Sequence, residues 1–550
     1  MSTIRSEEIP LPAEQAADEL HWPASYRPDR VDDRFDAIVI GSGMGGLSAA
    51  AFLALAGKRV LVLERHYTMG GFTHTFRRKA WEWDVGLHYV GEFDRGDTLG
   101  GLLMNDISQG RLEWAPLPAR YDRFVFPDRQ YDLVAGRGQF VDGLSGAFPD
   151  ERQAISQYVE LCDDVRRAGM KFFQAKALPR FLAPLASPFL CREFLRYSDQ
   201  TTLAVLRNLT HDPKLIGVLT AQWGAYGLPP AESSFGIHAI LSNHFIDGAC
   251  YPVGGAGSIA KSIVPTIEDA GGRLLVHAEV ERILVSGRRA IGVRMTDGHE
   301  ITAPVIISDA GIVNTFGKLV DDETRDALGL TALVAQTQPS VSHVCLYVGL
   351  NESAETLGLE PANLWVYPDY DHDRTVRANR TDPDANPPAV YMSFPSAKDP
   401  TWKVRHANTA TIELISFVDY EQFRPWENEP WMKRGESYDA LKKRYTDRLL
   451  DTLYEHLPQT KGKVAYHELS TPLSTRHFSN HPQGEVYGVE LSPERFRMNW
   501  LSPRTPVPGL FLTGQDALAH GIVGALYGGV VSAAAILGRN VTADAKRRVA

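Results

Sequence analysis

The chain has 550 residues, enough for more than one hydrophobic core, and its 44% hydrophobic and 23% charged residues are typical of a soluble globular protein. Its net charge of −10 argues against a general nucleic-acid binder, because such proteins present a basic surface. The four cysteines stand far apart without a CxxC pair, so the sequence predicts neither a disulfide framework nor a metal site and favours a reducing cytoplasm.

The N-terminal segment, residues 1–34, is polar, acidic and dotted with prolines, and it contains no apolar core of a signal peptide. We expect it to form an extended arm that packs across the surface of the protein.

The clearest structural unit is "DAIVIGSGMGGLSAAAFLALAGKRVLVLER", which starts at Asp36. It predicts a strand over 37–40, an alanine-rich helix up to about residue 56, and a strand over 60–63 that Glu64 closes. The turn has the pattern GxGxxG, formed by Gly41, Gly43 and Gly46. Strand, glycine turn, helix and acid in this order predict a dinucleotide site, with the pyrophosphate at the helix N-terminus and the ribose on Glu64. The carboxylate would repel a 2′-phosphate and so disfavours NADP.

Two later regions have the same character. After a glycine turn near Tyr251, we expect a helix from about Ser258 and short strands over 274–276, 280–285, 290–295, 300–302 and 305–308. Near the C-terminus we expect a strand over 510–513, a turn over 514–516, and a buried, glycine-rich helix over 521–538. That uncharged stretch is barely long enough to cross a bilayer, and tight packing on a sheet explains it better.

The predicted fold is therefore α/β, with one discontinuous Rossmann-type FAD-binding domain and an inserted α+β substrate domain. After the polar arm, the nucleotide domain is expected to comprise residues 35–111, 247–324 and 471–550, and the substrate domain residues 112–246 and 325–470.

The pair Gly70-Gly71 separates a flavin protein from a nicotinamide protein. FAD is long, and a second close backbone approach soon after Glu64 would pass its pyrophosphate and ribityl chain. Asp516 would bond a hydroxyl group of that chain, and the next helix would direct its N-terminus at the pyrimidine edge of the flavin, where reduced flavin is negative. The three regions favour FAD over NAD, and no separate NAD site is evident.

The motifs that follow one another along the chain resemble a known family: "VLVLERHYTMGGFTHTF", "WDVGLHYVG", "HAILSNHFIDGACYPVGG", "ISDAGIVNTF", "STPLSTRHFSNHPQGEVYG" and "LTGQDALAHGIVGALYGG". The sequence is similar to the FAD-dependent carotenoid desaturases, carotenoid isomerases and retinol saturases, and within this family it most resembles the retinol saturases. The resemblance implies that the cofactor is contacted by Gly41, Ser42, Gly43, Gly46, Glu64, Arg65, Gly70, Gly71, Phe72, Thr73, Val280, Ala310, Gly514, Asp516, Gly521 and Ile522. The backbone of Val280 would meet the adenine.

The resemblance implies redox chemistry on the C=C bonds of a hydrophobic polyene or unsaturated lipid, with saturation as the first hypothesis. Desaturation or cis–trans isomerisation of a carotenoid or polyunsaturated fatty chain is the second. A third hypothesis, of another class, is a non-catalytic FAD-bound lipid carrier or subunit of a complex. The electron donor or acceptor is not defined by the sequence.

Flavin transfers the hydride itself, so the protein has to orient the polyene, exclude water and handle one proton. The candidate catalytic residues are His88, Tyr89, His238 and His244, with His520 as a further histidine to consider. For each histidine, the alternative is a hydrogen-bonded side chain that only positions its loop. His74 is expected to have that anchoring role.

The segment 170–197 mixes phenylalanine and leucine with lysine and arginine. It could contact a membrane surface and admit a lipid substrate, or it could be a lid or core helix pair of the substrate domain. The expected location is cytoplasmic, peripheral to the membrane if the first alternative holds.

Overall fold

The computed structural model describes residues 23–31, 34–178, 182–382 and 384–549. Most of the predicted N-terminal arm lies outside these residues. Within the described part, Tyr26 N donates to the carbonyl oxygen of Val276 at 2.8 Å, so this short stretch lies along the nucleotide-binding part of the molecule.

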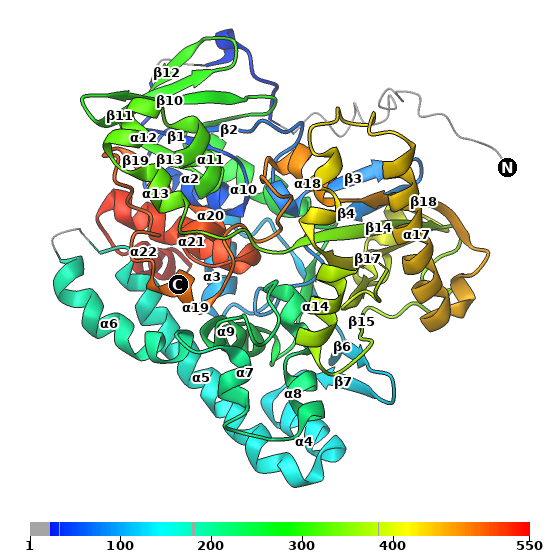
Figure 1. Ribbon diagram of the computed structural model, residues 1–550. Helices are drawn as coiled ribbons and strands as arrows, with labels where there is room; N and C mark the ends of the chain where they lie inside the picture. Colours follow the sequence, from blue (N-terminus) through cyan, green and yellow to red (C-terminus); the bar gives the residue numbers. More distant parts are fainter. Residues whose placement is uncertain (1–22, 32–33, 179–181, 383, 550) are drawn as a thin grey trace.

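A five-stranded parallel sheet forms the centre of the nucleotide-binding part (Figure 1). In sheet order its strands are β19 (Leu510–Leu512), β13 (Ile306–Ser308), β1 (Ala37–Ile40), β2 (Val60–Leu63) and β9 (Arg273–Leu275). Both faces are covered, which explains why these strands are continuous apolar runs rather than alternating ones. The strands predicted at 37–40 and 60–63 are confirmed at the predicted residues.

The two faces of this sheet pack on different layers, because alternate side chains of a strand point in opposite directions. Val39 and Val62 pack toward helices on one face, whereas Ile38 and Leu61 pack toward a small antiparallel sheet on the other. The helices are α2 (Met44–Ala54), α3 (Leu99–Ser108), α10 (Ser258–Asp269), α21 (Gly521–Leu537) and α22 (Val541–Val549). The antiparallel sheet contains β10 (Val280–Ser286), β11 (Arg289–Met295) and β12 (Glu300–Thr302). The predicted helix start at Ser258 is confirmed, and each predicted strand is confirmed with both of its ends within one residue of the prediction.

Helix α21 is buried, as predicted, but its main neighbour is α2 rather than the sheet. A Cβ atom on Gly529 would overlap Ser48 Oγ of α2, and one on Gly528 would lie 3.0 Å from the backbone nitrogen of Gly514. The small residues therefore let two helices and the end of β19 approach closely. No helix of the described ranges is by itself long and apolar enough to cross a membrane, and only the pair α21 and α22, bent by 108°, passes that test together.

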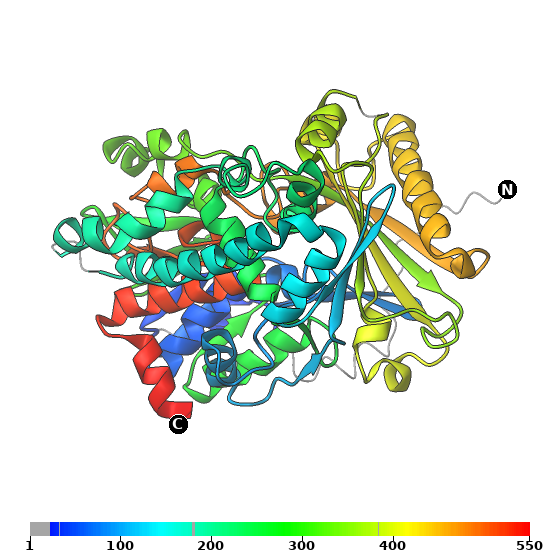
Figure 2. The same ribbon diagram turned by 90° about the horizontal axis from the view of Figure 1, so that it is seen from below.

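A seven-stranded mixed sheet forms the second part of the molecule. Its order is β18 (Val464–Ser470), β14 (Ser342–Leu350), β17 (Ala410–Val418), β16 (Val390–Ser393), β15 (Asn363–Val366), β6 (Arg120–Val125) and β7 (Gln130–Val134). Only β15 and β6 pair in parallel. Leu346 and Leu414 pack under α17 (Glu436–His456) on one face. Figure 2 shows this helix alongside the sheet at the edge of the molecule. His343 and Phe417 lie on the opposite face, toward the interior.

A layer of helices closes the interior from below (Figures 1 and 2). It contains α4 (Arg137–Ala147), α5 (Arg152–Ala175), α6 (Ala183–Ser198), α7 (Thr202–Leu206), α8 (Pro213–Leu219) and α9 (Phe235–Phe245). The predicted segment 170–197, of which residues 179–181 lie outside the described part, contains the end of α5 and most of α6. Phe172 and Phe194 are buried in this layer, whereas Leu185 and Phe189 are 71% and 83% exposed.

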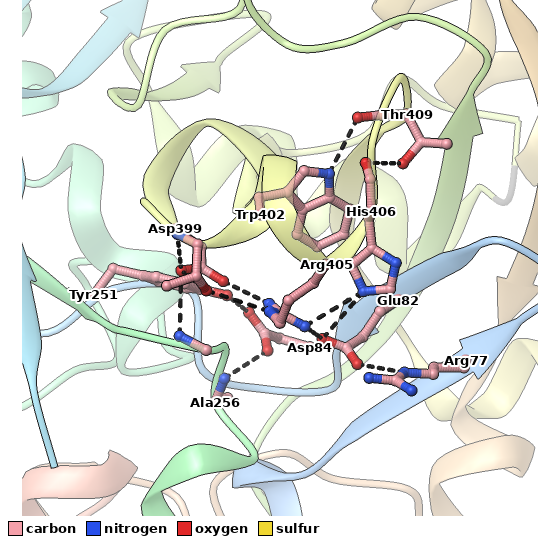
Figure 3. A network of polar contacts seen from close by, with 12 residues as sticks. Arg77, Glu82, Asp84, Tyr251, Ala256, Asp399, Trp402, Arg405, His406 and Thr409 are labelled. Carbon is pink, nitrogen blue, oxygen red and sulfur yellow. Dashed lines mark hydrogen bonds and ion pairs between the residues drawn. The ribbon is translucent and has the colours of Figure 1, made fainter. Parts of the chain in front are cut away.

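A buried polar network joins the two parts of the molecule (Figure 3). Arg405, at the end of α16 (Trp402–Arg405), bonds Glu82 of β4 (Trp81–Asp84) at 2.7 Å and Asp399 at 2.5 Å. Asp399 in turn accepts a bond from Gly254 N, in the loop that follows β8 (Cys250–Pro252). Burial raises the pKa of Glu82, but Arg405 and Arg77 outweigh burial and hold that pKa below its usual value.

Candidate functional site

A cleft of about 360 Å³ runs along the carboxyl ends of the parallel strands, the usual place for a ligand in such a sheet. The predicted cofactor residues that line it are Gly41, Gly43, Glu64, Arg65, Gly70, Gly71, Phe72, Thr73, Val280, Ala310, Asp516, Gly521 and Ile522. Residues from the start, middle and end of the chain thus meet in one cleft.

Three of the predicted residues lie behind the lining rather than in it. Ser42 is fully buried and donates to Glu64 Oε2 from its backbone nitrogen at 2.9 Å and from Oγ at 2.7 Å. A Cβ on Gly46 would overlap the carbonyl oxygen of Gly41, and Gly514 packs against Gly45. These residues shape the cleft without facing it.

The glycine turns fit a bound dinucleotide. A Cβ on Gly43 would come within 2.5 Å of the Asp309 carboxylate, and Gly70 N donates to Ser42 O at 3.1 Å. Gly71 has φ of +55°, and its Cβ position is 3.0 Å from Gly43 Cα. The second glycine pair therefore lies against the first turn, so two bare backbone segments border the same cleft, as an elongated cofactor requires.

The carboxylate of Glu64 retains capacity for a ribose. Its two oxygens accept bonds from Ser42 and from His66 N, the latter at 2.7 Å. A carboxylate offers about four acceptor positions, so one remains for a hydroxyl group of a ligand. The residue is 8% exposed and faces the cleft.

Asp516 has a structural role at the cleft in addition to the predicted bond to the cofactor. Its two carboxylate oxygens accept Ile312 N at 2.8 Å and Val489 N at 2.9 Å, which ties two loops to the strand end. The predicted turn over 514–516 is instead a short helix, α20 (Gly514–Ala517), which places these oxygens at the backbone amides. A bond to a ribityl hydroxyl would come in addition to these two.

An apolar cavity of about 660 Å³ lies between the seven-stranded sheet and the helical layer, within the size range of pockets for small hydrophobic ligands. One wall consists of alternate residues of the sheet, because these share a face. They are His343, Trp365, Tyr391, Ile415 and Phe417. The opposite wall comes from α5, α9 and α21.

The cleft and the cavity meet. Both are lined by Phe72, Val85, Gly86, Leu87, His343, Val486, Tyr487, Gly521 and Ile522. Gly521 is the first residue of α21, so the N-terminus of this helix lies at the junction, as expected for the pyrimidine edge of a flavin. A cofactor in the cleft would therefore present its far end to a ligand in the cavity.

His88 and Tyr89 lie in the cavity wall next to this junction. His88 Nδ1 is 2.6 Å from Glu413 Oε2, and Tyr89 donates to Asp122 Oδ2 at 2.9 Å. Burial and the charge of Lys398 lower the pKa of His88 to about 3, so this imidazole is neutral at pH 7. Burial and Asp122 raise the pKa of Tyr89 far above its usual value.

The other predicted histidines differ in position. His244 lines the cavity, and its Nε2 accepts a bond from Gly91 N at 2.8 Å, which anchors the neighbouring loop. His520 lines the cavity, and within the described residues its Nδ1 has no hydrogen-bond partner. His238 does not face the cleft or the cavity, because both ring nitrogens bond buried tyrosines. We therefore do not retain His238 as a catalytic candidate. His74 Nδ1 lies 2.5 Å from Gly71 O, which fits the predicted loop anchor.

Four residues of the site were missed at the sequence level: Asp309, His343, Lys398 and Glu413. Asp309 directly precedes the predicted Ala310 and lines the cleft. Burial raises its pKa to about 8, with smaller contributions from Glu64 and Asp516. Glu413 had a signal, since "TIELISFV" has one acid inside an apolar strand. Nothing near Lys398 in the sequence marks it as buried.

The nucleotide part of the chain matches a domain model. Residues 39–103 match the family described as NAD(P)-binding Rossmann-like domain. This match covers the glycine turn, Glu64 and the Gly70-Gly71 pair.

Similarity to curated proteins extends over nearly the whole chain. An all-trans-retinol 13,14-reductase from Danio rerio is 36% identical over 94% of this chain and 89% of that protein. The chain belongs to the all-trans-retinol 13,14-reductase family. The family predicted from the motifs is confirmed.

Other relatives widen the range of activities. A Danio rerio protein named inactive all-trans-retinol 13,14-reductase is 32% identical over 97% of this chain and 91% of its own length. A prolycopene isomerase from an Oncidium hybrid cultivar is 27% identical over 91% of this chain and 83% of its own length. The reductase family thus has isomerase relatives and a relative named inactive.

Solved structures support the fold. Cyclohexylamine oxidase from Brevibacterium oxydans IH-35A has a TM-score of 0.57 at 17% identity and covers 94% of this chain and 100% of its own. With the Rossmann-like domain match, this likeness confirms the predicted α/β fold class.

Proposed function

We propose that the protein is an FAD-dependent oxidoreductase that saturates one C=C bond of a retinoid or a similar conjugated, hydrophobic polyene. The observation that carries this proposal is the shared wall of the nucleotide cleft and the apolar cavity. Membership of the reductase family supports the direction of the reaction.

In this proposal FAD lies in the cleft, where Glu64 binds the ribose, Val280 faces the adenine and the Gly41 and Gly70 turns border the pyrophosphate. Bound FAD supplies hydride transfer. The chain contributes a dry apolar cavity that orients the polyene, and neutral or hydrogen-bonded side chains at the junction that handle the proton.

The test uses the purified chain reconstituted with FAD. The flavin is reduced in the absence of oxygen and mixed in turn with retinoids, carotenoids and unsaturated fatty acids. We expect reoxidation of the flavin and a product heavier by two hydrogen atoms, detected by mass spectrometry. Reduced flavin that every polyene leaves unchanged would refute saturation.

Isomerisation is the second candidate, and the similarity to prolycopene isomerase favours it over desaturation. It would give a product of unchanged mass with a shifted absorption spectrum. A non-catalytic carrier, suggested by the relative named inactive, would bind the polyene but leave both the flavin and the ligand unaltered.

We also propose that α6 contacts a membrane through Leu185 and Phe189, which are four residues apart and therefore lie on one face of the helix. Exposed Lys171 and Arg192 nearby would favour anionic lipids. The paired change Leu185→Ser and Phe189→Ser should abolish sedimentation with anionic vesicles if this holds. If the segment is a lid, the change should leave sedimentation as it is in the unaltered protein.

A further inference from the structure

A buried carboxyl group lies directly behind His88, on the side away from the cavity. Glu413, in the middle of β17, is fully buried. Its Oε1 accepts Asp84 N at 2.7 Å, and its Oε2 is 2.6 Å from His88 Nδ1. One carboxyl group therefore holds both ends of the short segment 84–88 that lines the junction of cleft and cavity.

The other ring nitrogen of His88 is free to face a ligand. His88 lines the cavity, and within the described residues its Nε2 has no hydrogen-bond partner in the protein. The imidazole thus bridges a buried carboxyl group and the cavity in which the polyene would lie.

We propose that His88 and Glu413 form a proton-delivery pair for the saturation reaction, with Glu413 as the positioning residue that supplies the proton to Nδ1 while His88 donates from Nε2 to a substrate carbon. This inference rests on the proposed function.

The surroundings of the pair favour a protonated carboxyl group. The nearest amine is that of Lys398, whose pKa burial lowers to about 7. Its Nζ donates to three neutral oxygens: the carbonyl oxygen of His88 at 2.8 Å, Ser393 Oγ at 2.7 Å and Asn363 Oδ1 at 2.5 Å. Among the described residues Glu413 has no lysine or arginine within ion-pair distance. The titratable groups that face the pair from the packed elements are Asp84 on β4, Tyr251 on β8, His343, Cys345 and Tyr347 on β14, Tyr391 on β16 and Lys398 on α15 (Pro395–Lys398).

The acid–base properties agree with this arrangement. Burial raises the pKa of Glu413 to about 8, although Lys398 and the Asp84 amide oppose the rise. At pH 7 the proton is therefore on Glu413 and His88 is neutral. A carboxyl O–H that donates to Nδ1 leaves the hydrogen of the imidazole on Nε2, the nitrogen available to a ligand in the cavity that His88 lines.

Atoms and electrons balance in this reaction. One carbon of the double bond would receive a hydride from bound reduced FAD, which an external two-electron donor would reduce again. The Nε2 proton of His88 goes to the adjacent carbon, and the Glu413 proton moves to Nδ1. The pair is left as a neutral imidazole and a carboxylate, which the Asp84 amide and the charge of Lys398 stabilise. A proton from water restores the first state.

The decisive measurement is the tautomer of His88, followed by nitrogen NMR on the full chain labelled in its histidines, with the His88→Asn spectrum for assignment. Below the pKa of Glu413, about 8, we expect the hydrogen on Nε2. Above it, the carboxylate should draw the hydrogen to Nδ1. A tautomer that does not change with pH would overturn the proposal. This measurement is made on the unaltered chain, so it does not depend on whether a variant folds.

The second arm uses Glu413→Gln, which keeps both hydrogen bonds but has no transferable proton. We expect unchanged flavin content and polyene binding, an Nε2–H tautomer at every pH, and polyene reduction slowed by about 100-fold or more. The matched control is Asp373→Asn, because Asp373 is another buried carboxylate that accepts a backbone amide, from Ala231 at 2.9 Å, but lies outside the cavity. It should reduce the polyene normally.

The outcomes separate the two proposals. If the unaltered enzyme reduces polyenes and Glu413→Gln does so equally fast, the proton-delivery pair is refuted and the proposed function stands. If the unaltered enzyme reduces no polyene, the proposed function fails, and the pair as a part of saturation fails with it.

Discussion

Three carboxylates, Glu64, Asp309 and Asp516, surround a cleft that we expect to hold the two negative charges of a pyrophosphate. Glu64 and Asp516 each accept hydrogen bonds from backbone or hydroxyl donors. Asp309 differs, because burial and its two acidic neighbours raise its pKa. A neutral Asp309 would reduce repulsion toward the cofactor.

Reversing the charge of Glu64 should reduce FAD retention. The change Glu64→Arg removes the acceptor for the ribose and the partner of Ser42, so we expect at least a tenfold loss of flavin per protein after gel filtration. Glu281→Arg is the control, since that residue is exposed on β10 and does not line the cleft. A flavin content equal to that of the unaltered protein would contradict the assignment of Glu64.

Asp309 should make the flavin-free protein less stable at higher pH. Its pKa is about 8 in the folded state against 3.8 ordinarily, so between these values the folded chain holds a proton that the unfolded chain has lost. Stability that this group contributes at low pH is therefore lost as the pH rises. We expect the free energy of unfolding of Asp309→Asn, relative to that of the unaltered protein, to increase over this pH range by less than about 1.4 kcal/mol per pH unit.

Denaturant unfolding at several pH values measures that difference. Asp97→Asn is the control, because the Asp97 side chain is 74% exposed and its bond to Arg95 lowers its pKa, so this variant should gain no stability over the unaltered protein as the pH rises. An advantage of Asp309→Asn that is constant with pH would mean that Asp309 is already charged in the folded protein.

At the scale of elements, local sequence patterns predicted the strands and helices whose ends are determined by neighbouring residues. The strand at 37–40 is a short apolar run directly before a glycine turn, and its ends were predicted to the residue. The packing of α21 on α2 was not predicted, because a surface of small, uncharged residues can pack on a helix as well as on a sheet. Likewise, Glu413 was missed because the partner that makes it functional, His88, lies 325 residues away in the chain.

The contact between α2 and α21 should tolerate no added methyl group. Gly529→Ala would push a Cβ into Ser48 and Ala49, and we expect a loss of about 1–3 kcal/mol in the free energy of unfolding. Gly143→Ala on α4 is the matched control, because nothing lies within 4 Å of its Cβ position, and it should stabilise the protein by about 0.5–1 kcal/mol. Equal unfolding midpoints in urea for the two variants would show that α2 and α21 can move apart without cost.

At the scale of the whole molecule, function depends on how two separately built parts meet. The parallel sheet supplies the cleft and the mixed sheet supplies a wall of the cavity. The Arg405 network bonds residues of both parts (Figure 3). This contact between the two parts could not be predicted, because Arg405 and Glu82 are 323 residues apart in the chain. The topology of the fold brings them together, and neither local sequence indicates it. The parallel pairing of β15 with β6 was unpredictable for the same reason.

Removing Arg405 should destabilise the contact between the two parts of the molecule. Arg405→Met leaves Asp399 without its cation and Glu82 with Arg77 alone of its two arginines. The side chains of Asp399 and Glu82 are 0% and 7% exposed, so we expect a loss of about 3–5 kcal/mol in the free energy of unfolding. Arg424→Met removes an exposed pair with Glu421 and should leave the unfolding midpoint nearly unchanged, because water screens that pair. Unfolding in urea, followed by circular dichroism, measures both. Similar losses for the two variants would mean that water reaches Glu82 and Asp399.

The arrangement of the cleft also sets an order of events during biosynthesis. Gly41 and Asp516 border the same cleft, and β19 is hydrogen-bonded to β13, so the cleft stays incomplete until residues beyond 516 have left the ribosome. A growing chain must therefore keep its early glycine turn without flavin until these later residues emerge. Loading with cofactor thus has to follow the synthesis of the third segment of the cleft.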